Sequence, residues 1–177
     1  IGALGALTTG DHNVAIGKSA GISINSGSGN ITIGYETGDA ITSGVDNIAI
    51  GRSALSTEDT GSRNTAIGRN ALQNLNFNGN GYNVAIGYNT GLNITTGVQN
   101  TLIGSAAGDA ITTGEFNVAI GYNALSSATD TDQSTAIGYG ALANLNLSGD
   151  SNNVAVGTNA GNQATTGIRN TLVGAFA

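Results

Sequence analysis

The chain has 177 residues, of which 39% are hydrophobic and 9% are charged, and its formal net charge is −6. This combination excludes a disordered chain, which would be poor in apolar residues and would carry a high net charge. With only five Lys and Arg residues, the sequence predicts no nucleic-acid-binding groove. A membrane-spanning helix needs a run of about 18 apolar residues, which the sequence lacks, so we expect no membrane span.

A five-residue motif, Asn-Val-Ala-Ile-Gly at residues 83–87, recurs along the whole chain. Its copies end on the motif glycines, which are Gly17, Gly34, Gly51, Gly68, Gly87, Gly104, Gly121, Gly138, Gly157 and Gly174. The steps between successive motif glycines are equal, except for two slightly longer steps that end at Gly87 and Gly157. A regular period of about 20 residues is typical of solenoid proteins, in which each repeat forms one coil.

The repeats divide the chain in sequence order. Residues 1–12 are an irregular lead-in or partial coil, and residues 13–177 are the repeat array. Residues 13–82 and 83–152 are two copies of a four-coil block, and the step from Gly17 to Gly87 is called here the block offset. The fourth residue after the motif glycine repeats with this offset and reads Gly21, Gly38, Leu55, Leu72, then Gly91, Gly108, Leu125, Leu142. Neither end resembles a capping element, so we expect a segment of a longer protein.

Alternation of apolar residues within each motif predicts a short β-strand. We expect the β-branched residues, such as Val84 and Ile86, to point into the coil and the intervening Ala85 to point outward. A second short strand is expected after a turn, with inward residues at Ala20, Ala54, Ala71 or Ala124 and at Ile24, Ile41, Ile94 or Ile111. Frequent glycines and β-branched residues argue against helices. The predicted fold is therefore all-β, a parallel β-solenoid of about ten coils of roughly 17–19 residues each.

Two residues of the motif are expected to have structural roles. The closing glycine is present in every copy, which predicts a positive φ or a backbone approach too close for a Cβ atom. The opening asparagine is replaced only once, by Ser134. Identical amides stacked in register can hydrogen-bond from one coil to the next, so we expect an asparagine ladder. The representative structural positions are Asn13, Gly17, Asn83, Gly87, Asn153 and Gly157.

The residue at the centre of the motif is uncharged in every copy. These residues are Ala15, Thr32, Ala49, Ala66, Ala85, Leu102, Ala119, Ala136, Ala155 and Leu172. If they point outward, the strand is apolar on both faces, as in parallel sheets that are buried on both sides. An exposed apolar stripe along the whole solenoid is near the limit for a soluble monomer, so we expect the chain to associate with copies of itself.

The tandem motif, Asn-x-Ala-Ile-Gly followed by x-x-Ala-Gly or x-x-Ala-Leu, resembles the head repeats of trimeric autotransporter adhesins and similar repeats of phage tail fibres. The resemblance covers residues 13–177 and rests on copies that hold their spacing. It implies a left-handed parallel β-roll, a side-by-side homotrimer, and an extracellular location on a virion fibre or a bacterial surface. The chain departs from the adhesin heads in its longer coils.

Residues that carry catalytic chemistry are scarce. The only histidine, His12, lies beside Asp11 in the lead-in, where we expect a surface residue. No second histidine or lysine partner accompanies a serine in a nucleophile constellation, so the sequence predicts no enzyme and no cofactor. Asp130 and Asp132 fall in the same part of their coil as the pair Glu58–Asp59 of the first block. Without the Gly-Gly-x-Gly-x-Asp repeat of calcium-binding β-rolls, these carboxylates are expected to be solvated loop charges rather than metal ligands.

The residue that follows the motif glycine is the best candidate for recognition, because four of the five tyrosines occupy this position. Tyr and Arg are enriched at recognition surfaces. The candidate ligand-facing stripe consists of Tyr35, Arg52, Arg69, Tyr88, Tyr122 and Tyr139. The alternative is that these side chains only stack on one another and stabilise the solenoid or its subunit interface.

The predicted function is that of a structural segment of an extracellular attachment fibre, whose stripe contacts a host-surface glycan. Two alternatives stay open. An ice-binding solenoid needs a flat and regular array of Thr, whereas Thr-rich positions such as Thr95 and Thr96 are expected at corners. A self-assembling extracellular filament is favoured by stackable repeats and Asn ladders.

Overall fold

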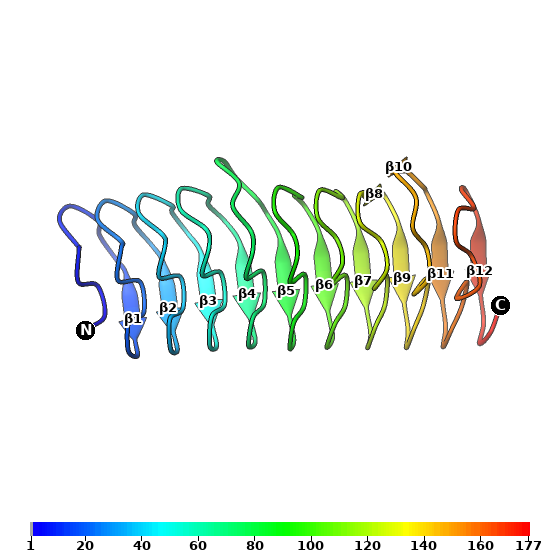
Figure 1. The fold of residues 1–177 in the computed structure, drawn as a ribbon, viewed down its shortest axis with the longest axis horizontal. Coiled ribbons are helices and arrows are strands. Elements are labelled where there is room, and N and C mark those ends of the chain that lie inside the picture. Colours follow the sequence, from blue (N-terminus) through cyan, green and yellow to red (C-terminus); the bar gives the residue numbers. More distant parts are fainter. Residues whose placement is uncertain (1) are drawn as a thin grey trace.

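The computed structural model describes residues 2–177, which wind into an elongated solenoid with its two ends far apart (Figure 1). One strand from each coil joins a parallel sheet of ten strands, arranged in sequence order. The strands of this sheet are β1 (Val14–Ile16), β2 (Ile31–Ile33), β3 (Ile48–Ile50), β4 (Thr65–Ile67), β5 (Val84–Ile86), β6 (Thr101–Ile103), β7 (Val118–Ile120), β9 (Thr135–Ile137), β11 (Val154–Val156) and β12 (Thr171–Val173). The strands β8 (Thr131–Asp132) and β10 (Gly149–Asp150) form a separate parallel pair. The predicted all-β parallel solenoid is confirmed.

Each strand pairs residue for residue with the next one. Leu102 of β6, for example, lies between Ala85 of β5 and Ala119 of β7. Equivalent residues therefore form columns along the solenoid, with about 4.8 Å between neighbouring coils. The separate pair β8 and β10 joins the longer eighth coil to the seventh, and the corresponding place in the first block has a single bridge between Ser62 and Asn80.

The predicted orientation of the strands was wrong. The central residues, such as Ala85 and Leu102, are fully buried, whereas the flanking β-branched residues, such as Val84 and Ile86, are half-buried or exposed. The reason is the narrow interior of the coil. The turn opposite each strand lies so close to it that alanine at the centre of the strand fills the space. A larger central residue such as Leu102 is accommodated only where the facing turns have glycine.

The predicted second strand does not form. The residues expected to point inward there, such as Ala124 and Ile111, are buried as predicted, but they lie in turns. These turns contain residues in the left-handed region, including Asn123 with a φ of 54° and Leu125 with a φ of 55°. A β-strand requires negative φ, so such residues exclude it.

The motif glycines meet both physical expectations. Gly87 has a φ of 142°, and a Cβ added to it would stand 2.6 Å from the carbonyl oxygen of Gly104 in the next coil. The backbones of neighbouring coils therefore approach each other too closely here for any side chain.

The lead-in continues the solenoid as a partial coil. The backbone N–H of Leu4 donates to the carbonyl of Ala20 at 3.2 Å, and that of Ala6 donates to Ile22 at 3.0 Å. Residues 2–177 contain no helix that could cross a membrane.

Candidate functional site

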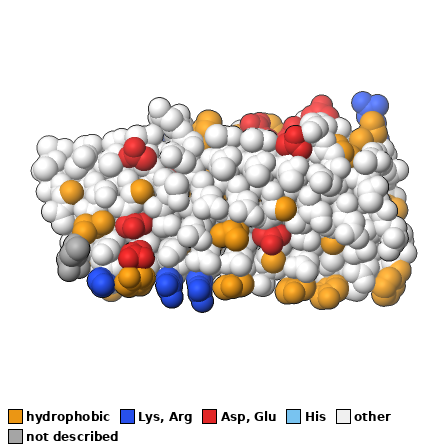
Figure 2. All heavy atoms as spheres, in the orientation of Figure 1, with side chains coloured by type: hydrophobic (Ala, Val, Ile, Leu, Met, Phe, Trp, Pro, Cys, Tyr) orange, Lys and Arg blue, Asp and Glu red, His pale blue; other side chains and the backbone are white. Residues whose placement is uncertain are grey.

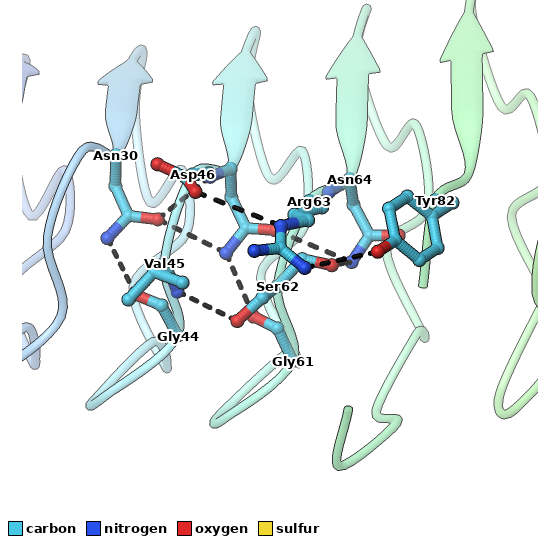
Figure 3. A network of polar contacts seen from close by, with 10 residues as sticks. Asn30, Gly44, Val45, Asp46, Gly61, Ser62, Arg63, Asn64 and Tyr82 are labelled. Atoms are coloured by element: carbon cyan, nitrogen blue, oxygen red, sulfur yellow. Dashed lines mark hydrogen bonds and ion pairs between the residues drawn. The ribbon is translucent and has the colours of Figure 1, made fainter. Parts of the chain in front are cut away.

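A ladder of buried asparagines runs along the start of the strands (Figure 3). The Asn47 side-chain amide donates to Asn30 Oδ1 at 3.1 Å and to the Gly61 carbonyl at 2.9 Å, and Asn47 Oδ1 accepts the backbone N–H of Asn64 at 3.0 Å. Each amide thus joins its own coil to the coils on both sides. The expected ladder is present, and its role is structural because these side chains are buried.

The representative structural asparagines all take part in this ladder. The side-chain amide of Asn13 donates to the Gly27 carbonyl at 2.7 Å, and the amide of Asn83 donates to the Gly97 carbonyl at 2.9 Å. The amide of Asn153 makes the equivalent contact with the Gly167 carbonyl at 2.6 Å. Each asparagine therefore ties the start of its strand to the following corner.

Ser134 interrupts the ladder. Its backbone N–H still donates to Asn117 Oδ1 at 3.0 Å, and its hydroxyl is hydrogen-bonded to the hydroxyl of Ser151. The equivalent of Ser151 in the first block is Gly81, where an added Cβ would collide with the Asn64 amide. Asn is thus paired with Gly in one block and Ser with Ser in the other. The sequence interpretation missed this compensation, although comparison of the two blocks at the block offset reveals it.

The outer side of the ten-stranded sheet is a continuous surface of β-branched side chains, called here the β-branched face. Its two columns are Val14, Ile31, Ile48, Thr65, Val84, Thr101, Val118, Thr135, Val154, Thr171 and Ile16, Ile33, Ile50, Ile67, Ile86, Ile103, Ile120, Ile137, Val156, Val173. No position is charged. Ile86 in the middle of the face is 36% exposed and Ile16 near one end is 59% exposed.

The residues that follow the motif glycines form a ridge at the ends of the strands, and most of them are exposed. The ridge consists of Lys18, Tyr35, Arg52, Arg69, Tyr88, Ser105, Tyr122, Tyr139 and Thr158. The Lys18 ammonium and the Arg52 guanidinium lie over the Tyr35 ring, at 5.4 and 5.5 Å from its centroid. Figure 2 shows Lys and Arg side chains and hydrophobic side chains following one another along one long edge of the molecule. Stacked columns of this kind are what the parallel register produces.

The rest of the ridge contains the other predicted stripe residues. The Arg69 guanidinium lies 5.9 Å from the centroid of Tyr88, and the rings of Tyr122 and Tyr139 stack at 5.4 Å with an interplanar angle of 18°. The structure therefore brings all six predicted stripe residues to one exposed edge. Their mutual stacking and their exposure occur together.

One carboxylate modifies the charge of the ridge. The pKa of Tyr35 is raised, first by a side-chain hydrogen bond with Glu36 and then by the negative charge of that residue. The Glu36 carboxylate therefore offsets the positive charge of the Lys18 and Arg52 side chains beside Tyr35. The Arg69 guanidinium lies instead over the ring of Tyr88, in the coil that follows its own.

Glu58 corrects one prediction, because its side chain is fully buried rather than solvated. Its Oε1 accepts the backbone N–H groups of Gly61 at 2.8 Å and of Asp59 at 3.1 Å, and its Oε2 accepts that of Phe77 at 3.3 Å. Burial raises the pKa of this carboxyl. Its position was readable from the repeat, since the equivalent residue one coil earlier is the core residue Ile41.

The acidic edge of the second block is occupied by protein donors. Asp130 accepts hydrogen bonds from the hydroxyls of Ser148 and Thr129, which lower the pKa of Asp130. Asp132 Oδ1 accepts the backbone N–H of Glu115 at 2.7 Å. Within residues 2–177 no group of three or more His, Cys, Asp or Glu side chains is placed to hold a metal ion.

His12 and Asp11 are both exposed in the lead-in. The surfaces that stand out on the molecule are therefore the β-branched face and the ridge. No family model, no curated protein and no solved structure matches the chain.

Proposed function

We propose that the chain is a rigid rod segment of an extracellular attachment fibre, assembled side by side with copies of itself. The observation that carries this proposal is the β-branched face. The face is uncharged and, apart from its threonines, apolar, and monomeric proteins rarely leave so long a surface of this kind in contact with water. The contact surface consists of the β-branched columns and not of the alanine column, because the alanines are buried inside each coil.

The shape of the face suits association of parallel rods. It is part of one regular sheet, and sheets pack face to face about 10 Å apart. Because the face runs along the whole solenoid, copies that join through it form a bundle of fixed width, and cyclic symmetry closes such a bundle. The resemblance to adhesin heads and tail-fibre repeats supports three copies.

The ridge supports an attachment role. It combines exposed Tyr and Arg side chains, which are typical of recognition surfaces. A rod that projects from a virion or a cell and contacts a host-surface glycan along this ridge fits the resemblance. The extracellular location belongs to the same proposal.

An ice-binding role is the second candidate, and one observation favours it. Thr65, Thr101, Thr135 and Thr171 lie in one column of the flat outer face, rather than at the corners. The parallel column contains only Ile and Val, which favours burial against another chain over ordering of water. Thermal hysteresis of the protein in solution would establish the second candidate.

Sedimentation equilibrium tests the proposed assembly. We expect the mass of three chains for the wild type and the mass of one chain for the double variant Ile86→Lys/Ile103→Lys. The control is Thr96→Lys, a charge introduced at an exposed corner away from the β-branched face, which should keep the wild-type mass. Circular dichroism verifies that each variant is folded.

A monomeric wild type at micromolar concentration would contradict the assembly. Electron microscopy separates it from the filament alternative. Discrete rods of fixed width agree with a closed bundle, and fibrils that grow without limit favour the filament.

A further inference from the structure

Ser105, in the sixth coil, interrupts the run of tyrosines on the ridge and leaves a gap between two aromatic rings. Tyr88 precedes it by one coil and Tyr122 follows it by one coil. Main-chain hydrogen bonds hold the three coils in register here. The N–H of Ala106 donates to the Tyr88 carbonyl at 2.9 Å, and the N–H of Asn123 donates to the Ser105 carbonyl at 3.2 Å.

The two rings beside the gap each have one face covered and one face open. The far face of Tyr88 is covered by Arg69 and the far face of Tyr122 by Tyr139. Among residues 2–177 no ring or cation stacks on the faces that look toward Ser105. Both tyrosines are 50% exposed. Tyr35 differs, because Lys18 and Arg52 both lie over its ring.

The gap has the width of one sugar ring. Two coils at about 4.8 Å each place the two tyrosines about 10 Å apart. A ring inserted midway would lie about 5 Å from each tyrosine. A pyranose fills this distance, because its chair and its C–H groups project from the mean plane of the ring. The C–H groups of a pyranose carry partial positive charge, which suits the negative faces of aromatic rings. Ser105 occupies the column position between the two tyrosines, and its hydroxyl can donate or accept a hydrogen bond.

Charge on the ridge selects the kind of glycan. Three of the five Lys and Arg residues of the chain, Lys18, Arg52 and Arg69, lie on the ridge on the Tyr88 side of the gap. The chain as a whole has a net charge of −6, so this edge differs in sign from the average of the molecule. A carboxylate or sulfate on a neighbouring sugar would meet Arg69 first and Arg52 one coil further on.

We propose that Tyr88, Ser105 and Tyr122 form a slot that holds one sugar ring of an acidic glycan, with Arg69 and Arg52 beside the adjoining acidic sugars. This inference rests on the proposed attachment function and names its ligand class. It assigns a two-sided stacking site to one place on the ridge, instead of an even stripe.

Titration with defined hexasaccharides tests the slot. Acidic probes are the hexasaccharides of alginate, hyaluronan and polysialic acid, and neutral probes are maltohexaose and cellohexaose. Binding is followed by calorimetry and by tyrosine fluorescence of the assembled protein. We expect at least one acidic hexasaccharide to bind, with affinity that falls as salt is raised.

The decisive variant is Ser105→Tyr, which fills the slot with a third ring while continuing the existing stack. We expect it to fold normally and to weaken acidic-hexasaccharide binding about tenfold or more, as loss of contact with both ring faces requires. The matched control is Thr158→Tyr, which extends the stack beside Tyr139 without entering the slot, and it should bind like the wild type. Arg69→Gln should weaken acidic probes alone.

The outcomes separate the inference from the proposed function. Equal binding of neutral and acidic hexasaccharides would overturn the acidic preference and leave glycan attachment in place. Unchanged binding by Ser105→Tyr would overturn the slot. If this variant instead changed the mass of the assembly without losing binding, the slot would be overturned and this edge assigned to another role. No binding of any hexasaccharide by correctly assembled protein would overturn the slot and the glycan contact, while the rod assembly is judged separately by its mass.

Discussion

The Cδ1 methyl of Leu102 lies where a side chain at Gly91 would have to be, 2.9 Å from the position of an added Cβ. The Cδ2 methyl of Leu102 stands 2.9 Å from the corresponding position at Gly108 in its own coil. In the first block Thr32 occupies the equivalent space beside Gly38. When the central strand residue of a coil is larger than alanine, the fourth residue after the motif glycine is therefore glycine, both in the turn of that coil and in the turn of the preceding coil. Where the central residues of both coils are alanines, as at Ala119, the turn has leucine.

This complementarity predicts a compensating pair. Leu102→Ala should destabilise the fold by about 2–5 kcal/mol, as buried leucine truncations do. Gly108→Leu alone should also destabilise it, because its side chain would overlap Leu102. The double variant Leu102→Ala/Gly108→Leu recreates the arrangement of Ala119 and Leu125 and should recover part of both losses.

The backbone permits the exchange at this position. Gly108 has a φ of 57°, and Leu125 has a φ of 55° at the equivalent place, so leucine already adopts this conformation in the same turn. Urea unfolding of the wild type, the two single variants and the double variant gives the coupling energy. Strictly additive losses would contradict the compensation.

A second prediction concerns the interrupted ladder. Ser134→Asn should destabilise the protein by about 1–3 kcal/mol, because the larger amide would overlap the side chain of Ser151. Adding Ser151→Gly recreates the pair formed by Asn64 and Gly81 and should restore stability. The reciprocal variant Gly81→Ser should destabilise the first block. If Ser134→Asn alone were as stable as the wild type, the two serines would not be a compensating pair.

The intact ladder predicts different effects for inner and outer asparagines. Asn100→Ala would leave the buried backbone N–H of Asn117 and the carbonyl of Gly114 without their partners. The loss should be about 1–3 kcal/mol for each group left unpaired. Asn13→Ala, at the partly buried first position, should have a smaller effect, since water can replace the amide. Denaturant unfolding midpoints compare the two, and equal losses would contradict a dependence on burial.

Glu58 predicts a specific pH dependence of stability. Burial is the main cause of its raised pKa, and the nearby charge of Asp59 adds to it. A carboxyl whose pKa is higher in the folded than in the unfolded state stabilises the fold below its unfolded pKa, and this contribution is lost as pH rises through the folded pKa. We therefore expect the stabilising contribution of Glu58 to decline as pH rises from about 4.5, the ordinary value, through its higher pKa in the folded state.

Glu58→Gln should remove this decline, so the difference in unfolding free energy between variant and wild type should grow with pH. Asp130→Asn is a control of opposite sign. Hydrogen bonds from Ser148 and Thr129 lower the pKa of Asp130, so its contribution is present at neutral pH and is lost in acid. Urea unfolding over a pH series measures both. A difference between Glu58→Gln and wild type that is independent of pH would contradict the assignment.

The repeat by itself determined the parallel solenoid, the asparagine ladder and the ridge. A constant spacing of motif glycines places equivalent residues in register, and register alone stacks Asn on Asn and Tyr122 on Tyr139. These features need no knowledge of what lies across the coil. The position of Glu58 was equally available, because it occupies the column of Ile41.

Only the tertiary structure decided which side of the strand is inside. Alternation defines two faces, but both faces of this strand are apolar, so hydrophobicity could not choose between Ala85 and Ile86. The choice is made by the distance to the opposite turn, where positive-φ residues bring the chain back too sharply for a second strand or a wide core. Small side chains fit that interior, and the β-branched residues consequently lie outside. The open ring faces beside Ser105 likewise depend on which neighbours cover the other sides of Tyr88 and Tyr122, and contacts of that kind exist only in the folded chain.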